Sequence, residues 1–488
     1  MQAIKHFIAV ISAAIVTATA GAQSALPFER PVISRPSIPD REVVLTDFGA
    51  KSDGVTDNSG AFAVAMAELA AKGGGRLVVP DGIWLTGPIV FESNIEMHLS
   101  DGALILFSDN FADYPLVSTV FEGLDMMRCQ SPIMAVGKTD IAITGNGTIN
   151  GSGDAWRPVK RGKLAPTKWE KLVKNGAVNH KGDTWFPTER IREIAEDGIR
   201  DKGKLSDGRT DWDYAHDFLR PVLLSFISCR NVLLEDVTFE NSPSWNLHPL
   251  MCENVLINRV NVRNPWYAQN GDGLDAESCR NVLVTDCIFD VGDDAICIKS
   301  GKDRDGRLRA KPCENVVIER CTVYHGHGGF VIGSEMSGGV RNVAISDCVF
   351  IGTDCGLRFK SARGRGGVVE SIYINNINMA NIDGDALIFD LYYGIKGKPE
   401  LKPVTEETPC FRDIHISDVL CRGADRAMLF NGLPEMPLTG IKVKNSTFRT
   451  RLGADLRYVD GLHFDNVTID QSEGEPVLLT DVSNFNAD

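Results

Sequence analysis

A short phrase recurs through the middle of this 488-residue chain, and its repetition constrains the fold more than any other feature. Each copy consists of a cysteine (a valine in the last copy), a charged residue and an Asn-Val pair. The repeated asparagines are Asn231, Asn254, Asn281, Asn315 and Asn342, which lie 23, 27, 34 and 27 residues apart. A repeat of about 25 residues without a helical stretch predicts the stacked coils of a parallel β-helix.

Apolar residues keep a fixed distance from each repeated asparagine. The side chains one, three and eight residues later are apolar in all five copies, as in Val232, Leu234 and Phe239. The same pattern returns in segments 372–379, 414–421 and 462–469, where the repeated asparagine is absent. Alternation with a period of two indicates short strands that each bury one face. We therefore expect an all-β fold with one continuous core inside the coils.

The twelve cysteines of the chain first suggest disulfide bonds. Six residues after the repeated asparagine, however, Cys287, Cys321 and Cys348 share a column with Val237 and Val260. A cysteine that alternates with valine behaves as a small, buried apolar side chain. We expect a ladder of free cysteines, and the alternative is that some of them form disulfides.

Three segments fall outside the repeat. Residues 57–72 are rich in alanine, end at three glycines and predict a helix that caps the N-terminal end of the stack. Residues 154–220 form a long polar insertion with four tryptophans, of a length that is usually functional. Residues 1–22 are typical of a signal peptide, because Lys5 and His6 precede an apolar run and a small-residue cleavage site. We expect a single domain over residues 23–488, exported to the periplasm or secreted, and monomeric.

Charge and hydropathy limit the partners of this chain. The formal net charge of −14 argues against a nucleic-acid partner, because phosphate binding needs an excess of basic residues. No stretch beyond the N-terminal segment has the length needed to cross a bilayer, so we expect no membrane partner. An acidic polymer as substrate would need a local basic patch.

The repeat allows four successive coils to be aligned. Their inward-facing residues form one column, which consists of Leu274, Ile296, Phe330 and Leu357. Neighbouring rungs of a β-helix lie about 4.8 Å apart. This register places Asp272 beside Asp294, and Asp293 beside His327.

The outward face of these coils gathers groups that suit acid–base chemistry. Arg358 and Lys360 fall one rung beyond the histidine, on the same wall. Asp293 and Asp294 can serve one site only if the chain bends there, which Gly292 permits. Crowded carboxylates raise one another's pKa, so one can donate a proton while another activates water, as glycosidic cleavage requires. The competing interpretation is a set of solvated aspartates or a calcium site.

Four short motifs carry a family resemblance. They are Asn270-Gly-Asp272, Gly292-Asp293-Asp294, Gly326-His327-Gly328 and Arg358-Phe-Lys360. In this order they resemble the signature of glycoside hydrolase family 28, the polygalacturonases, and the chain resembles the exo-acting bacterial members of that family. Gly271 and Phe359 replace the threonine and isoleucine that are usual in the family. The resemblance implies a right-handed parallel β-helix that hydrolyses α-1,4-linked galacturonan with inversion, without metal or cofactor.

The resemblance also implies a role for each residue. Asp293 corresponds to the general acid, and Asp272 and Asp294 correspond to the pair that activates water. His327 corresponds to the histidine that supports the acid. The candidate substrate-binding residues are Arg358, Lys360, Asn270 and Lys299. A guanidinium and an ammonium both suit the carboxylate of a uronate sugar.

Several features leave alternatives open. The insertion 154–220 could close one end of the cleft, which favours exo action on the ends of a pectic polysaccharide or oligogalacturonide. The basic run 302–311, with Arg363 and Arg365, is either a further substrate contact or a solvated loop. Trp245 and Asn246 either line the groove or pack in the core.

Three other functions compete with the polygalacturonase interpretation. A rhamnogalacturonan or xylogalacturonan hydrolase would use the same fold. A pectate lyase would need calcium and a basic residue that abstracts a proton. A carbohydrate-binding or adhesive β-helix would not depend on Asp293 at all.

Overall fold

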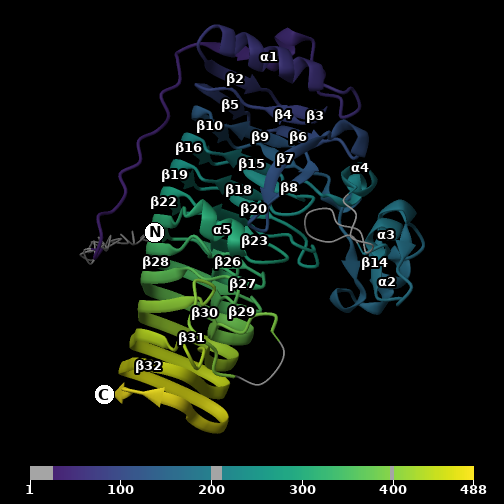
Figure 1. Ribbon diagram of the computed structural model, residues 1–488. Helices are drawn as coiled ribbons and strands as arrows, with labels where there is room; N and C mark the ends of the chain where they lie inside the picture. Colours follow the sequence, from purple (N-terminus) through teal and green to yellow (C-terminus); the bar gives the residue numbers. More distant parts are fainter. Residues whose placement is uncertain (1–25, 199–210, 396–399) are drawn as a thin grey trace, which may run out of the picture.

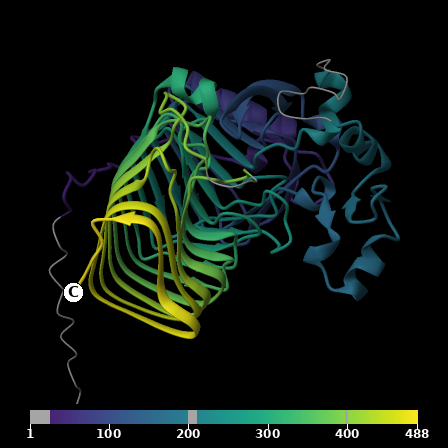
Figure 2. The ribbon, with the colours of Figure 1, turned by 60° about the horizontal axis from the view of Figure 1, so that its bottom comes forward.

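One large parallel sheet, wound into a stack of coils, dominates the molecule (Figures 1 and 2). The computed structural model describes residues 26–198, 211–395 and 400–488, so the predicted signal peptide lies outside the described residues. Among these residues the sheet contains 28 strands, and every pairing described within it is parallel, as in β16 with β19 and β21 with β24. The predicted parallel β-helix is confirmed.

The strands stack in three columns. The first column, which contains the repeated asparagines, is formed by β1 (Glu42–Val44), β2 (Gly75–Val79), β5 (Ile95–Leu99), β10 (Thr139–Gly145), β16 (Arg230–Glu235), β19 (Glu253–Asn258), β22 (Arg280–Thr285) and β25 (Cys313–Glu319). The second is formed by β3 (Gly82–Thr86), β6 (Ala103–Phe107), β11 (Thr148–Asn150), β17 (Thr238–Glu240), β20 (Asn261–Arg263), β23 (Ile288–Asp290) and β26 (Thr322–Tyr324). The third is formed by β4 (Ile89–Val90), β9 (Ile133–Val136), β15 (Leu224–Ile227), β18 (Leu247–Leu250), β21 (Leu274–Glu277), β24 (Ile296–Lys299), β27 (Gly328–Ile332) and β29 (Cys355–Lys360).

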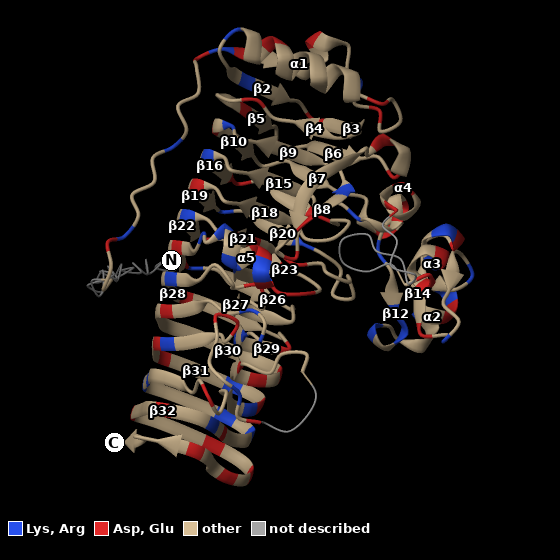
Figure 3. Ribbon diagram, in the orientation of Figure 1, with Lys and Arg blue, Asp and Glu red and all other residues tan. Residues whose placement is uncertain are grey.

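Towards the C-terminus single long strands run around the corners of the coils. They are β28 (Val340–Ile351), β30 (Val368–Asp390), β31 (Cys410–Asn431) and β32 (Leu438–Ser483), followed by β33 (Asn486–Ala487). Their pairing continues the columns, since β28 pairs with both β25 and β26. Charged residues are spread along the outside of the stack (Figure 3).

The repeated asparagines hold one corner of the stack. All five adopt left-handed backbone conformations, with φ between 54° and 59°, which asparagine tolerates better than most residues. Each of the last four side-chain amides donates to the amide oxygen of the asparagine one coil earlier, at 3.0 to 3.2 Å. The repeat is therefore both a turn signal and a ladder of hydrogen bonds.

The cysteines lie inside the stack as the column with valine predicts. All twelve are free, and Cys287, Cys321 and Cys348 are each at most 1% exposed. They belong to the continuous apolar core that also contains Val237 and Val260. The ladder interpretation is confirmed, and the disulfide alternative is wrong.

The ends and the insertion complete the fold. Helix α1 (Ser59–Ala71) buries Phe62, Met66 and Leu69 against the first coils and caps the stack, as predicted. The insertion stands beside the stack (Figures 1 and 2) and contains α2 (Pro166–Leu172), α3 (Glu189–Glu196), α4 (Trp212–Ala215) and the sheet of β12 (Val159–Lys160), β13 (Ala177–Val178) and β14 (Thr184–Phe186). Its tryptophans Trp169 and Trp185 form a small core of their own. No helix among the described residues is long and apolar enough to span a membrane.

Candidate active site

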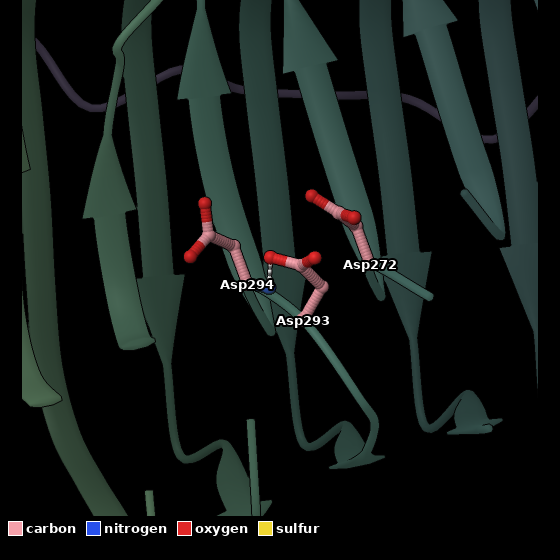
Figure 4. Close-up of side chains that lie close together, drawn as sticks. All are labelled: Asp272, Asp293 and Asp294. Carbon is pink, nitrogen blue, oxygen red and sulfur yellow. Dashed lines mark hydrogen bonds between the residues drawn. The ribbon is translucent and has the colours of Figure 1, made fainter. Parts of the chain in front are cut away.

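Three aspartates converge just before the third-column strands of two neighbouring coils (Figure 4). Asp272 precedes β21, and Asp293 and Asp294 precede β24. The backbone N–H of Gly273 donates to the carbonyl oxygen of Asp294 at 2.9 Å, which fixes the predicted register. One carboxylate oxygen of each aspartate lies within 4.8 Å of the others.

The bend that brings Asp293 and Asp294 together depends on Gly292. A Cβ atom at this position would meet the carbonyl oxygen of Pro265 at 2.6 Å and the backbone nitrogen of Ala268 at 2.7 Å. Because these are backbone atoms, no flexible side chain can move aside, and only glycine fits. The predicted bend is therefore built from close backbone packing.

His327 lies one rung beyond Asp293, as the register predicts. Its backbone N–H donates to the carbonyl oxygen of Asp293 at 2.9 Å, and its Nδ1 lies 3.0 Å from Oδ2 of Asp354. The hydrogen bond to Asp354 raises the pKa of His327 against the opposing effect of burial, and the charge of Asp293 raises it further. Asp354 was not among the predicted site residues, although the alignment of coils places it one rung after the histidine.

Two cations lie against Asp294. Nζ of Lys360 is 2.6 Å from Oδ2 of Asp294, and Nη1 of Arg358 is 3.5 Å from Oδ1. Both cations lie near the ring of Tyr393, whose centroid is 5.1 Å from the ammonium and 5.7 Å from the guanidinium carbon. The predicted basic patch therefore directly neighbours the carboxylate cluster.

Lys299 also lies at the site, but buried carboxylates hold it. Its Nζ is 2.9 Å from Oε2 of Glu335 and 3.5 Å from Oδ1 of Asp275, and it lies 4.8 Å from the ring centroid of Trp245. Strand alternation predicts an outward-facing Asp275, yet its side chain is completely buried. Period-two alternation does not show what covers the outside of a coil, so this ion-pair network was missed.

Asn270 fixes the loop before the first aspartate. It has a left-handed conformation with φ of 53°, and its Oδ1 accepts a hydrogen bond from Nη2 of Arg220 at 2.8 Å. Arg220 also donates to the carbonyl oxygen of Gln269 at 2.8 Å. Arg220 belongs to the end of the insertion, where no repeat gives a register, so sequence reasoning missed this anchor.

The protonation of the aspartates follows from their surroundings. Burial raises the pKa of Asp293, and the Asp294 carboxylate adds to the effect. Burial also raises the pKa of Asp272 well above its ordinary value, with Asp275 and Asp293 adding to it. Burial acts on Asp294 in the same direction, but the cations, Lys360 first, outweigh it and lower the pKa to about 2. The cluster thus combines two carboxyl groups of raised pKa, on Asp272 and Asp293, with one of lowered pKa, on Asp294.

A cavity of about 430 Å³ surrounds these groups, within the range of small-ligand sites. Lys160 and Lys163 of the insertion line it, together with Glu122 of the hairpin β7 (Leu116–Phe121) and β8 (Leu124–Cys129). All the predicted site residues line the cavity: Asp272, Asp293, Asp294, His327, Arg358, Lys360, Asn270 and Lys299.

Some of the basic residues of the run 302–311 and its neighbours line the cavity, and others form ion pairs elsewhere. Lys302 and Arg365 line the cavity. Arg309 instead contacts Glu277, and Arg363 contacts Glu435. Within the run 302–311, Lys302 thus lines the cavity, whereas Arg307 and Arg309 form ion pairs with Glu407 and Glu277.

The aromatic candidate Trp245 both lines the cavity and packs in the interior. It is 2% exposed and packs against Phe121 with tilted rings, whose centroids lie 4.7 Å apart. Its neighbour Asn246 is fully buried. Both interpretations thus hold for Trp245, whereas Asn246 packs.

A parallel β-helix with a cavity lined by carboxylates and basic groups defines a class, the β-helix enzymes that cleave polysaccharides. The family model for glycosyl hydrolases family 28 matches residues 173–421, and the chain belongs to this family. The predicted fold class, a right-handed parallel β-helix, and the predicted family are both confirmed, and the protein is a glycoside hydrolase.

Several relatives support this assignment. A probable polygalacturonase of Vitis vinifera is 30% identical over 413 residues, which are 83% of this chain and 73% of the relative. An exo-poly-alpha-D-galacturonosidase of Dickeya chrysanthemi is 30% identical over 360 residues, 72% of this chain and 57% of the relative. The crystal structure of an exopolygalacturonase from Thermotoga maritima is 33% identical, with a TM-score of 0.75 and coverage of 91% of this chain and 95% of that one.

Proposed function

We propose that this protein hydrolyses the α-1,4 bonds of polygalacturonate and oligogalacturonides, and that it does so from the chain end. The observation that carries the proposal is the contact of Lys360 and Arg358 with Asp294, which places two cations for a uronate beside the acid–base cluster. The relatives named polygalacturonase and exopolygalacturonase support the same substrate.

In the proposed mechanism Asp293 donates its proton to the leaving glycosidic oxygen. Its raised pKa favours the protonated form that this step needs. The cation of His327 then stabilises the carboxylate that forms on Asp293. Asp294, the ionised member of the cluster, accepts a proton from the attacking water, while Asp272 holds that water by a hydrogen bond.

Substrate binding is expected to change the pKa of Asp294, the proposed base. In the free enzyme Lys360 and Arg358 hold the pKa of Asp294 low, at about 2, which makes it a weak base. A substrate carboxylate that pairs with these two cations weakens their hold on Asp294. The pKa of Asp294 then rises, so the base gains strength only when a uronate occupies the site.

Exo action is supported by what closes the cavity. Lys160 and Lys163 of the insertion, Glu122 of the β7–β8 hairpin and Tyr393 of the loop after β30 all line it. These groups come from segments outside the regular coils, and they narrow the groove that a bare β-helix would present. We propose that Lys160, Glu122 and Tyr393 stop the chain end and that the enzyme releases short products.

The carboxylates and cations of the site also bear on whether the enzyme is a hydrolase or a lyase. The three aspartates could hold a divalent cation, as a lyase would require. The ammonium of Lys360, however, already lies 2.6 Å from Asp294 and supplies the positive charge there. We therefore favour hydrolysis over elimination. The relatives named polygalacturonase and exopolygalacturonase favour galacturonan over rhamnogalacturonan or xylogalacturonan as the substrate.

The cellular setting is part of the proposal. Export to the periplasm or the medium would bring the enzyme to pectic polysaccharide of plant cell walls. We further propose that it acts as a monomer, with no nucleic acid or membrane as partner.

Substitution of the acid tests this function. Asp293→Asn is expected to lower the release of reducing ends from polygalacturonate by at least about a hundredfold. Asp286→Asn is the matched control, because Asp286 forms an ion pair with Arg320 at 2.8 Å and does not line the cavity. Full activity of Asp293→Asn would overturn the proposal. A product that absorbs as an unsaturated uronate, and disappears with chelator, would indicate a lyase instead.

A further inference from the structure

A second cavity adjoins the catalytic one. It has a volume of about 340 Å³ and shares Lys163 and Gly292 with the catalytic cavity. Asp354 also lines it, and this residue is the partner of His327. The His327–Asp354 pair and the side chain of Lys163 therefore stand between the two spaces.

An exposed tryptophan forms part of the wall of the second cavity. Trp266 lies in the loop after β20 and is 46% exposed, whereas Trp84, Trp156 and Trp245 are each at most 2% exposed. It packs edge-on against Tyr267 with 5.9 Å between ring centroids, and Tyr267 lines the catalytic cavity. An exposed aromatic ring in a cavity presents a flat apolar face, which suits the C–H face of a sugar ring.

The polar groups of this cavity complement a uronate sugar. Lys163 ends the short 3-10 helix η4 (Arg161–Lys163), and its ammonium forms no ion pair within the described part of the chain. Asp383 offers an exposed carboxylate that can accept hydrogen bonds from sugar hydroxyls. His325 is held by Asp290 at 2.9 Å and closes another side.

We propose that the second cavity is an outer subsite for a galacturonate unit of the substrate chain, with the sugar ring on Trp266 and its carboxylate beside Lys163. This inference rests on the proposed function, because it takes galacturonan as the substrate. The insertion then has two roles, since it narrows the catalytic cavity and also supplies the cation that binds a more distant part of the chain.

The test measures how strongly the enzyme prefers longer chains. The quantity is the ratio of kcat/KM for tetragalacturonate to kcat/KM for digalacturonate, because only the longer chain reaches both cavities. Trp266→Ala is expected to lower this ratio about fivefold, the effect of one lost aromatic contact. Lys163→Met is expected to lower it by a similar factor, and less at high salt, since salt screens the charge of the partly exposed Lys163.

Lys168→Met is the matched control, because Lys168 is an exposed lysine of the same insertion that lines neither cavity. It is expected to leave the ratio at the wild-type value. An unchanged ratio in Trp266→Ala would overturn the subsite. A lowered ratio in Trp266→Ala but not in Lys163→Met would overturn the assignment of a uronate. If the wild-type enzyme cleaves neither oligogalacturonide, the proposed function itself fails.

Discussion

The pair of His327 and Asp354 makes a sharp prediction about pH. The substitution Asp354→Asn keeps the size of the side chain and removes the charge that lies 3.0 Å from Nδ1 of His327. The hydrogen bond that this carboxylate accepts from His327 is the main reason why the pKa of His327 is raised, and the charge of Asp354 adds to it. We therefore expect His327 to lose its proton at a lower pH in the variant.

The size of the shift follows from the geometry. The side chain of Asp354 is 43% exposed, so a water-like dielectric applies, and two charges 3.0 Å apart then interact by about 1.4 kcal/mol. This energy corresponds to a shift of about one pH unit. If a cationic His327 supports the acid Asp293, the basic limb of kcat moves down by about one pH unit in Asp354→Asn.

The pH dependence of folding stability tests the pair of His327 and Asp354 independently. The raised pKa of His327 stabilises the fold below about pH 6.5, and this contribution is lost as the pH rises through the folded-state value. The pKa of Asp354 is lowered, so its ionised form stabilises the fold above about pH 3.9. This contribution is lost as the pH falls through the folded-state pKa of Asp354. Asp354→Asn should therefore lower the melting temperature at pH 6 more than at pH 9.

The assay is the pH profile of kcat on digalacturonate. The control is Asp413→Asn, because Asp413 and His415 form a similar pair at 2.8 Å on β31, and neither lines the catalytic cavity. This control should keep the wild-type profile. A basic limb that does not move in Asp354→Asn, while the protein stays folded, would refute the role given to His327.

Three further predictions concern the base, the coil corner and the stereochemistry. Lys360→Met is expected to lower kcat/KM on polygalacturonate about a hundredfold and to move the acidic limb to higher pH, because the pKa of Asp294 rises without the ammonium; an unmoved limb would contradict this. Asn254→Ala is expected to cost about 2–3 kcal/mol in urea denaturation through its left-handed conformation and two ladder hydrogen bonds, and Asn254→Gly about 1 kcal/mol less; equal losses would exclude a backbone contribution. Proton NMR of the first product is expected to show the β-anomer. The test is informative because carboxylate oxygens of the three aspartates lie within 4.8 Å of one another, whereas the two carboxyl groups of inverting enzymes are usually roughly 6.5–9.5 Å apart. An α-anomer as the first product would contradict inversion.

Much of the fold and part of the site could be predicted because the repeat supplies a register. Once the coils are aligned, the position of a residue within its own coil also determines its neighbours above and below. Asp272 beside Asp294 and Asp293 beside His327 follow from this rule alone. The cysteine ladder follows as well, because a residue that shares a column with valine must lie inside.

The residues that the sequence did not reveal lie where the register ends. Lys160 and Lys163 come from the insertion, whose packing against the stack has no repeat to predict it. Glu335 follows β27 in a connection of irregular length, so its ion pair with Lys299 could not be placed. Asp354 is different: the alignment placed it correctly, but only the 3.0 Å contact with His327 shows its importance.

Time-resolved sizing of the products from polygalacturonate tests the central claim most directly. A hydrolase that acts at the chain end, with the insertion and the loop of Tyr393 closing its cavity, should release one short saturated product from the first minutes while the polymer shortens slowly. Asp293→Asn should release almost none. Large oligomers at early times would contradict exo action, and an unchanged rate in Asp293→Asn would contradict the assignment of the acid.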